Sequence, residues 1–117
     1  RLNGLESRAR AIEADALADS RERRRAGLLR ESADVVVTNP PFFEDDRHRR
    51  SPDARRAAAH ALPSGGLERW LRAAIDVLKP GGRLALIHRA ERVGDVLAAL
   101  AGRLGAVRIR PVHAKAE

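Results

Sequence analysis

The fold of this chain is decided by residues 33–43, which read ADVVVTNPPFF. Residues 34–38 predict a strand, because a continuous β-branched apolar run is typical of a strand buried on both faces of a parallel sheet. A residue before proline is pushed out of helical geometry, so Asn39 is expected to continue the strand. Pro40 and Pro41 then fix the backbone and offer no N–H donor.

The end of this strand has the chemistry of a clamp for a planar amine. The side-chain oxygen of Asn39 and the carbonyl oxygen of Pro40 are two acceptors that converge on one point. Phe42, two residues further on, is able to stack on a flat heterocycle. These groups suit an exocyclic NH₂ on a base or an amide. The alternative is a simple strand-ending turn, which Asn-Pro often starts.

The flanking patterns predict an α/β sandwich around a mostly parallel sheet. The expected elements are a short strand at 8–14, a basic helix at 20–31, an amphipathic helix at 67–78, a strand at 83–88, a second amphipathic helix at 91–104 and an alternating strand at 107–112. Ligands of such sheets bind at the carboxyl ends of the strands, where Asp15, Asn39 and His88 are expected.

Composition narrows the class of protein. A chain of 117 residues without cysteine is expected to be one domain, with no disulfide, thiolate metal site or cysteine nucleophile. The net charge of +7 favours an anionic partner, although an arginine-rich composition also arises from the base composition of a genome. The polar loop at 44–66 carries Arg47, Arg49 and Arg50 and is expected to face the substrate, because such long loops are usually functional or disordered.

Other classes of site are not expected. The four histidines at positions 48, 60, 88 and 113 lack metal-ligand spacing. No apolar stretch approaches the roughly 18 residues that span a bilayer. No signal peptide is visible, which favours a cytoplasmic location.

Three stretches of the chain resemble the class I S-adenosylmethionine-dependent methyltransferases that modify planar amines. They are IEAD at 12–15, the stretch 33–43 and LKPGGRLALI at 78–87. Within that class the chain is similar to bacterial tRNA adenine-N6 methyltransferases of the valine-tRNA type. That similarity rests on Phe43, SPD at 51–53 with AH at 59–60, IHRAER at 87–92 and RPVH at 110–113, and covers almost the whole chain.

The resemblance implies S-adenosylmethionine as the cofactor, tRNA or another structured RNA as the partner, and an adenine N6 amine as the target. Asp15 would bind the adenine amine of the cofactor, with Asn39 also at the cofactor. As catalytic residues, Asn39 and Pro40 would hold the target amine while Phe42 stacks on the target base. The implied substrate contacts are Pro41, Phe43, Arg47, Arg49 and Arg50.

The resemblance also implies a partial Rossmann-like domain over residues 1–117. In the family's strand order, 3-2-1-4-5-7-6, the chain would supply strands 3, 4, 5 and 6. It would lack the first two strands, with their glycine-rich loop and acidic residue, and the last hairpin strand. We expect such a fragment to be inactive alone and to require the remainder of its own domain as a partner.

Two other functions stay open. A protein glutamine N5-methyltransferase uses the same clamp on an amide, although the basic loop and Phe42-Phe43 fit that family less well. A non-catalytic RNA-binding module, without the cofactor half, is the second alternative.

Overall fold

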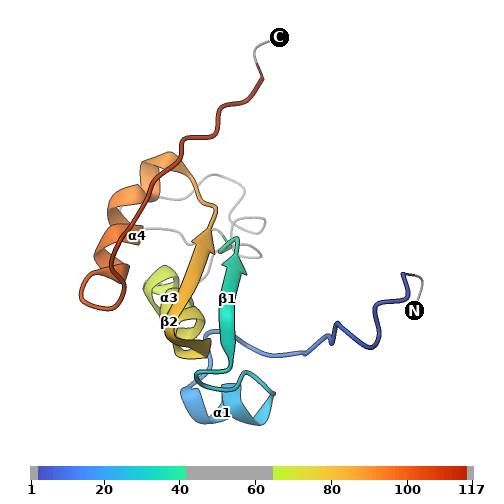
Figure 1. The fold of residues 1–117 in the computed structure, drawn as a ribbon. Coiled ribbons are helices and arrows are strands. Elements are labelled where there is room, and N and C mark those ends of the chain that lie inside the picture. The colour runs from blue at the N-terminus through green and yellow to red at the C-terminus, as the bar shows by residue number, and fades with distance from the viewer. Residues whose placement is uncertain (1–2, 42–64, 116–117) are drawn as a thin grey trace, which may run out of the picture.

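The computed structural model describes residues 3–41 and 65–115. Its elements, in chain order, are α1 (Ser20–Arg25), β1 (Ala33–Thr38), α3 (Gly66–Val77), β2 (Leu78–Leu86), the 3-10 turn η1 (Ala90–Arg92) and α4 (Val93–Leu100). In Figure 1, β1 and β2 run side by side in the same direction, with α1 near the end at which β1 begins. The predicted α/β arrangement with a parallel sheet is therefore confirmed for the described residues.

The core lies between α3, α4 and one face of the strands. Its buried members are Leu67, Leu71, Val96, Ala99 and Leu100, and Leu84 and Leu86 of β2 pack against them. Leu67, Leu71 and Ile75 are four residues apart along α3, so they share one helical face. The predicted helix at 67–78 is confirmed to within one residue at each end.

The strand pair has a regular register with one irregularity. Val35 to Thr38 pair with Arg83 to Leu86, whereas Ala33 pairs with Leu78. The residues between Leu78 and Arg83 include Gly81, whose φ of +79° is left-handed, and Gly82. A Cβ on Gly82 would lie 2.8 Å from the Lys79 carbonyl oxygen and 3.1 Å from the Asp34 carbonyl oxygen. The close approach of two backbone segments therefore requires glycine here.

The expectation that the strand at 34–38 is buried on both faces is wrong for the described structure. Side chains alternate across a strand, so Val36 and Thr38 face the helices while Val35 and Val37 face away. Val35 is 56% exposed and Val37 is 78% exposed, and Ile87 beyond β2 is also exposed. No described element covers this second face.

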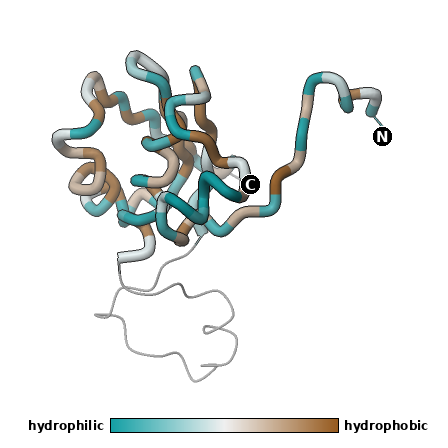
Figure 2. The backbone as a smooth tube through the Cα atoms, turned by 90° about the horizontal axis from the view of Figure 1, so that it is seen from below, coloured by the Kyte–Doolittle hydropathy of each residue, from teal (hydrophilic) through white to brown (hydrophobic). Residues whose placement is uncertain are grey.

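The predicted strands at 8–14 and 107–112 are also wrong, because neither segment is assigned as a strand. β1 and β2 pair only with each other among the described residues. An extended segment without a neighbour leaves its N–H and C=O groups to solvent and gains nothing from a ladder. Both terminal segments run away from the body in Figure 1, and Figure 2 shows the same for the N-terminal one.

The basic helix is shorter than predicted. Asp19 caps its start by accepting hydrogen bonds from the N–H groups of Arg21 and Glu22, both at 2.9 Å. The helix ends at Arg25, and Gly27 follows with a φ of +105°. A left-handed glycine commonly terminates a helix, so residues 28–31 form the connection to β1 instead of a last turn. The second amphipathic helix likewise ends at Leu100, four residues before the predicted limit.

Candidate active site

The candidate site lies at the carboxyl end of β1, where the strand gives way to residues 39–41. The N–H of Ile87 donates to the Thr38 carbonyl oxygen at 3.1 Å, so the parallel strands stay hydrogen-bonded up to the residue before Asn39. From the helix side, the Trp70 indole N–H donates to the Thr38 hydroxyl oxygen at 2.8 Å. The base of the proposed clamp is thus fixed by both β2 and α3.

The two acceptor-bearing residues differ in exposure. Pro40 is buried, and because it has no N–H, its burial leaves no backbone donor unsatisfied. Asn39 is exposed, and its side-chain amide makes no hydrogen bond to any described residue. The role of Asn39 and Pro40 as a clamp for an amine stays a prediction. Pro41, the next residue, is half-buried.

His88 lies at the same edge of the sheet, two residues beyond the end of β2. Partial burial lowers the pKa of His88 below its ordinary value of 6.5, and the charges of Arg92 and Arg89 lower it further. Asp95 acts in the opposite direction but is the weakest of these influences. The lowered pKa favours the neutral form of the imidazole beside the proposed clamp.

Asp15 is placed differently from the prediction. It does not end a strand, because residues 9–15 are irregular. Its Oδ1 accepts a hydrogen bond from the N–H of Leu17 at 2.8 Å, which makes a local turn. No hydrogen bond or ion pair joins Asp15 to residues 39–41 in the described structure. The other carboxylate oxygen has no described partner, and its role at a cofactor stays a prediction.

Five predicted site residues lie outside the described part of the chain. They are Phe42, Phe43, Arg47, Arg49 and Arg50. Their predicted contacts with the target base and with RNA stay predictions.

Trp70 has a role that the sequence reasoning missed. Its position on the apolar stripe of the helix indicated a core residue, and it does pack against the core. Its indole N–H also supports Thr38, the residue before the clamp. The available signal was chemical: a partly buried tryptophan usually finds an acceptor for its N–H.

The described residues contain no group of three His, Cys, Asp or Glu side chains placed to hold a metal ion. None of their helices is both long and apolar enough to cross a membrane.

The comparison with protein families shows the family of this chain. The model of the family described as N-6 DNA methylase matches residues 2–93, which include β1, the clamp and β2. The chain belongs to the N-6 DNA methylase family. The predicted relation to methyltransferases is thereby confirmed.

Two curated relatives of this methylase-family chain come from two strains of Porphyromonas gingivalis. Both are tRNA1(Val) (adenine(37)-N6)-methyltransferases, 40% identical to the chain over 63 residues. The match covers 54% of this chain and 24% of each relative, so the chain spans about a quarter of the length of the curated relatives it matches.

A solved structure supports the methylase fold. It is the crystal structure of a predicted O-methyltransferase, protein Atu636 from Agrobacterium tumefaciens. The two chains are 29% identical with a TM-score of 0.54, and the match covers 77% of this chain and 33% of that one. The described strands and helices are thus part of a Rossmann-like methyltransferase fold.

Proposed function

We propose that this chain supplies the amine-binding part of an S-adenosylmethionine-dependent methyltransferase that acts on the N6 amine of an adenine in tRNA. The observation that carries the proposal is the exposed amide of Asn39, which has no partner among the described residues, beside the rigid Pro40 backbone at the carboxyl end of a methylase-family strand. Two tRNA adenine-N6 methyltransferases among its relatives support the choice of substrate.

The residues fit the proposed cofactor as far as they are described. Asp15 has a carboxylate oxygen without a described partner, which suits an amine donor, and Asn39 is exposed. When bound, S-adenosylmethionine would supply an electrophilic methyl group on a sulfonium sulfur. The neutral His88 would keep the sheet edge from repelling that positive charge.

The clamp would act on the nucleophile. The lone pair of an adenine amine is delocalised into the ring, which makes the nitrogen a weak nucleophile. The Asn39 oxygen and the Pro40 carbonyl oxygen would each accept one N–H, favouring a pyramidal nitrogen and aiming its lone pair at the methyl group. A new N–C bond would form as the S–C bond breaks, and the amine proton would then leave to solvent. This is catalysis by position and electrostatics.

The proposal is tested in a chimera, because the chain spans only 24% of each curated relative. Residues 2–93 replace the corresponding segment of the Porphyromonas enzyme, and nucleoside mass spectrometry follows N6-methyladenine in tRNA. We expect methylation with the native segment and a loss of about 100-fold or more with Asn39→Ala. A folded chimera that keeps its activity with the Asn39→Ala substitution would contradict the proposed clamp.

The glutamine alternative is decided with the same chimera. A release-factor peptide with a target glutamine is offered in place of tRNA. Methylation of the peptide, with none of the tRNA, would favour the glutamine N5-methyltransferase.

A further inference from the structure

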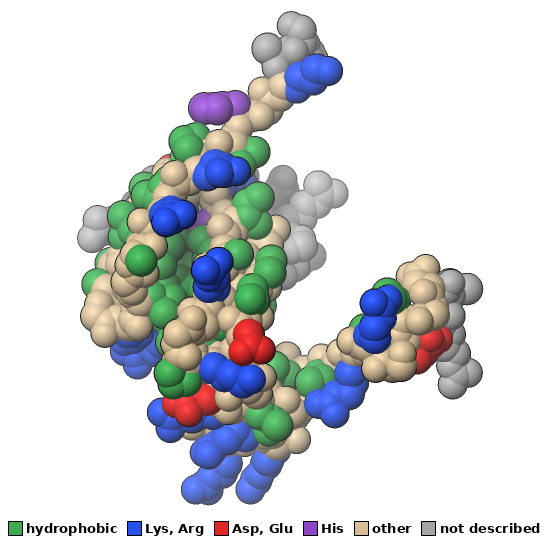
Figure 3. Space-filling view, in the orientation of Figure 1, with side chains coloured by type: hydrophobic (Ala, Val, Ile, Leu, Met, Phe, Trp, Pro, Cys, Tyr) green, Lys and Arg blue, Asp and Glu red, His purple; other side chains and the backbone are tan. Residues whose placement is uncertain are grey.

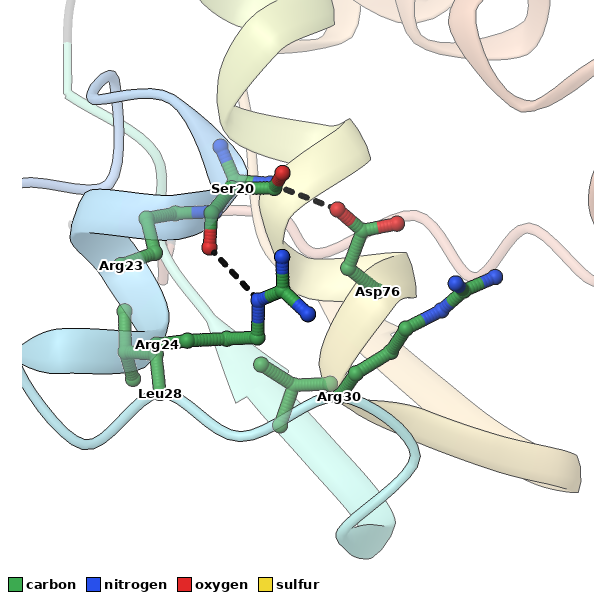
Figure 4. Close-up of a pocket in the computed structure, with 7 residues that line it drawn as sticks. Ser20, Arg23, Arg24, Leu28, Arg30 and Asp76 are labelled. Carbon is green, nitrogen blue, oxygen red and sulfur yellow. Dashed lines mark hydrogen bonds and ion pairs between the residues drawn. The ribbon is translucent and has the colours of Figure 1, made fainter.

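A pocket of about 250 Å³ lies at the opposite end of β1 from the clamp, where α1 meets the end of α3 (Figure 4). It is lined by Ser20, Arg23, Arg24, Leu28, Arg30, Asp76 and Val77. The connection from α1 to β1 is anchored here, because Glu31 N–H donates to the Asp76 carbonyl at 2.8 Å and Ser32 N–H donates to the Val77 carbonyl at 2.9 Å. These backbone bonds fix the position from which Arg30 extends.

The side chains that line this pocket carry an excess of positive charge. Its only acidic side chain among the described residues, Asp76, is already paired with Arg23 at 2.6 Å, and the Arg23 side chain is only 12% exposed. Arg24 uses its Nε to donate to the Ser20 carbonyl at 3.2 Å, which leaves its terminal N–H groups without a described partner. Arg30 makes no hydrogen bond or ion pair with any described residue. Among the described residues, the terminal N–H groups of Arg24 and the whole guanidinium group of Arg30 therefore have no partner.

A neighbouring groove provides a useful contrast. It is lined by four arginines, but each of them is already bonded to the protein. Arg69 donates to the Leu17 carbonyl at 2.5 Å, Arg72 pairs with Glu68 at 3.0 Å, and Arg103 donates to the Ala99 carbonyl at 2.8 Å. The fourth, Arg23, is the partner of Asp76. Each of these four arginines has a partner at a terminal guanidinium nitrogen, whereas Arg24 is bonded only through Nε and Arg30 has no described partner.

We propose that Arg24 and Arg30 bind a backbone phosphate of the RNA substrate, an inference that rests on the proposed function. A guanidinium group presents paired N–H donors that match phosphate oxygens. In Figure 3, Lys and Arg side chains gather at the end of the molecule occupied by α1. The ion pair with Arg23 neutralises Asp76, the one described carboxylate that lines the pocket, so it repels an anion less.

The position of the pocket defines the kind of RNA. The six residues of β1 separate it from the clamp, which corresponds to about 20 Å. A single nucleotide therefore does not reach both sites, and the phosphate held by Arg24 and Arg30 belongs to a nucleotide other than the methylated one. Recognition of an extended or folded RNA follows from this separation.

Binding of a fluorescent RNA stem-loop to the full 117-residue chain tests the inference. Arg24→Gln/Arg30→Gln is compared with Arg83→Gln/Arg108→Gln, which removes the same charge from exposed arginines outside the pocket. We expect the pocket pair to weaken binding about 10-fold or more and to reduce the slope of log K against log salt by about one. If the two double variants lose RNA affinity equally, the loss comes from net charge alone and the proposed phosphate site is wrong.

A second measurement needs no variant. An arginine-specific dicarbonyl reagent is applied with and without RNA, and mass spectrometry reads each modified site. We expect RNA to protect Arg24 and Arg30 but not Arg83. No protection overturns the proposal, as does equal protection by AMP or inorganic phosphate at the same phosphate concentration, which would identify a free phosphate as the ligand.

These readouts are independent of methyl transfer. If the chimera fails to methylate tRNA while RNA still protects Arg24 and Arg30, the proposed function falls and the phosphate site remains. If methylation is intact without protection, only the phosphate site falls.

Discussion

Thr38 is the residue through which the helix layer supports the clamp. Its hydroxyl accepts the indole N–H of Trp70 at 2.8 Å, and its carbonyl accepts the N–H of Ile87. Replacing Thr38 with Val keeps the shape but removes this hydrogen bond between α3 and β1. We expect Thr38→Val to lower the free energy of unfolding by about 1–2 kcal/mol in urea titrations.

A double-mutant cycle separates this bond from packing. Trp70→Phe removes the donor, so Thr38→Val should cost less in that background than in the native chain. If the two substitutions are simply additive, the hydrogen bond contributes nothing to stability.

His88 makes stability depend on pH in a predictable direction. Its pKa is lower in the folded chain than the ordinary value of 6.5, so the unfolded chain takes up a proton first as the pH falls. The contribution of the neutral His88 to the unfolding free energy is fully present above pH 6.5. It is lost as the pH falls from 6.5 through the lower pKa of the folded chain. We expect His88→Asn to flatten the fall in unfolding free energy below pH 6.5. An unchanged pH profile would contradict the assigned environment.

At the scale of elements, the start of β2 depends on Gly82. A methyl group there would lie 2.8 Å from the Lys79 carbonyl oxygen and 3.1 Å from the Asp34 carbonyl oxygen, both backbone atoms that cannot move aside like the end of a side chain. We expect Gly82→Ala to lower the unfolding free energy by about 1–3 kcal/mol. Gly94→Ala is the matched control, because Gly94 lies in α4 with nothing within 4 Å of an added Cβ. There alanine should stabilise by about 0.5–1 kcal/mol.

The elements predicted from sequence succeeded where the pattern was local. A β-branched run followed by Asn-Pro-Pro predicted β1, and a single apolar face predicted α3. Segments 8–14 and 107–112 have strand-like composition, but a strand also needs a neighbour, and composition does not report one. The helix predicted at 20–31 ends at Arg25 because the left-handed Gly27 follows it.

The candidate site also has features that a local sequence pattern predicts and features that depend on contacts between distant residues. The proposed clamp was open to prediction because Asn39 and the two prolines are adjacent in sequence, and its role stays a prediction. Its support by Trp70 and the arginine pocket could not be predicted, since they join residues 32 and 53 positions apart in the chain. Such contacts depend on how α3 packs against β1 and α1, which no local pattern encodes.

At the scale of the whole molecule, the uncovered sheet face is the main exposed apolar surface of the strands. Val37 is 78% exposed on it, whereas Val36 is half-buried against the helices. We expect Val37→Thr to reduce binding of the dye ANS while changing the unfolding free energy by less than about 0.5 kcal/mol. Val36→Thr is the matched control and should destabilise the chain by about 1 kcal/mol. Unchanged dye binding in the Val37→Thr variant would mean that this face is not open in solution.

The central claim is that Asn39 and Pro40 hold an exocyclic amine, and nuclear magnetic resonance of the Asn39 side-chain amide tests it most directly. Adenosine and N6,N6-dimethyladenosine are titrated into the ¹⁵N-labelled chain; the second ligand has the same ring but no N–H for the two acceptors. We predict that adenosine shifts the Asn39 amide signals, that the dimethylated nucleoside does not, and that Asn39→Ala abolishes adenosine binding. Equal shifts with both nucleosides, or adenosine binding that survives Asn39→Ala, would contradict the account.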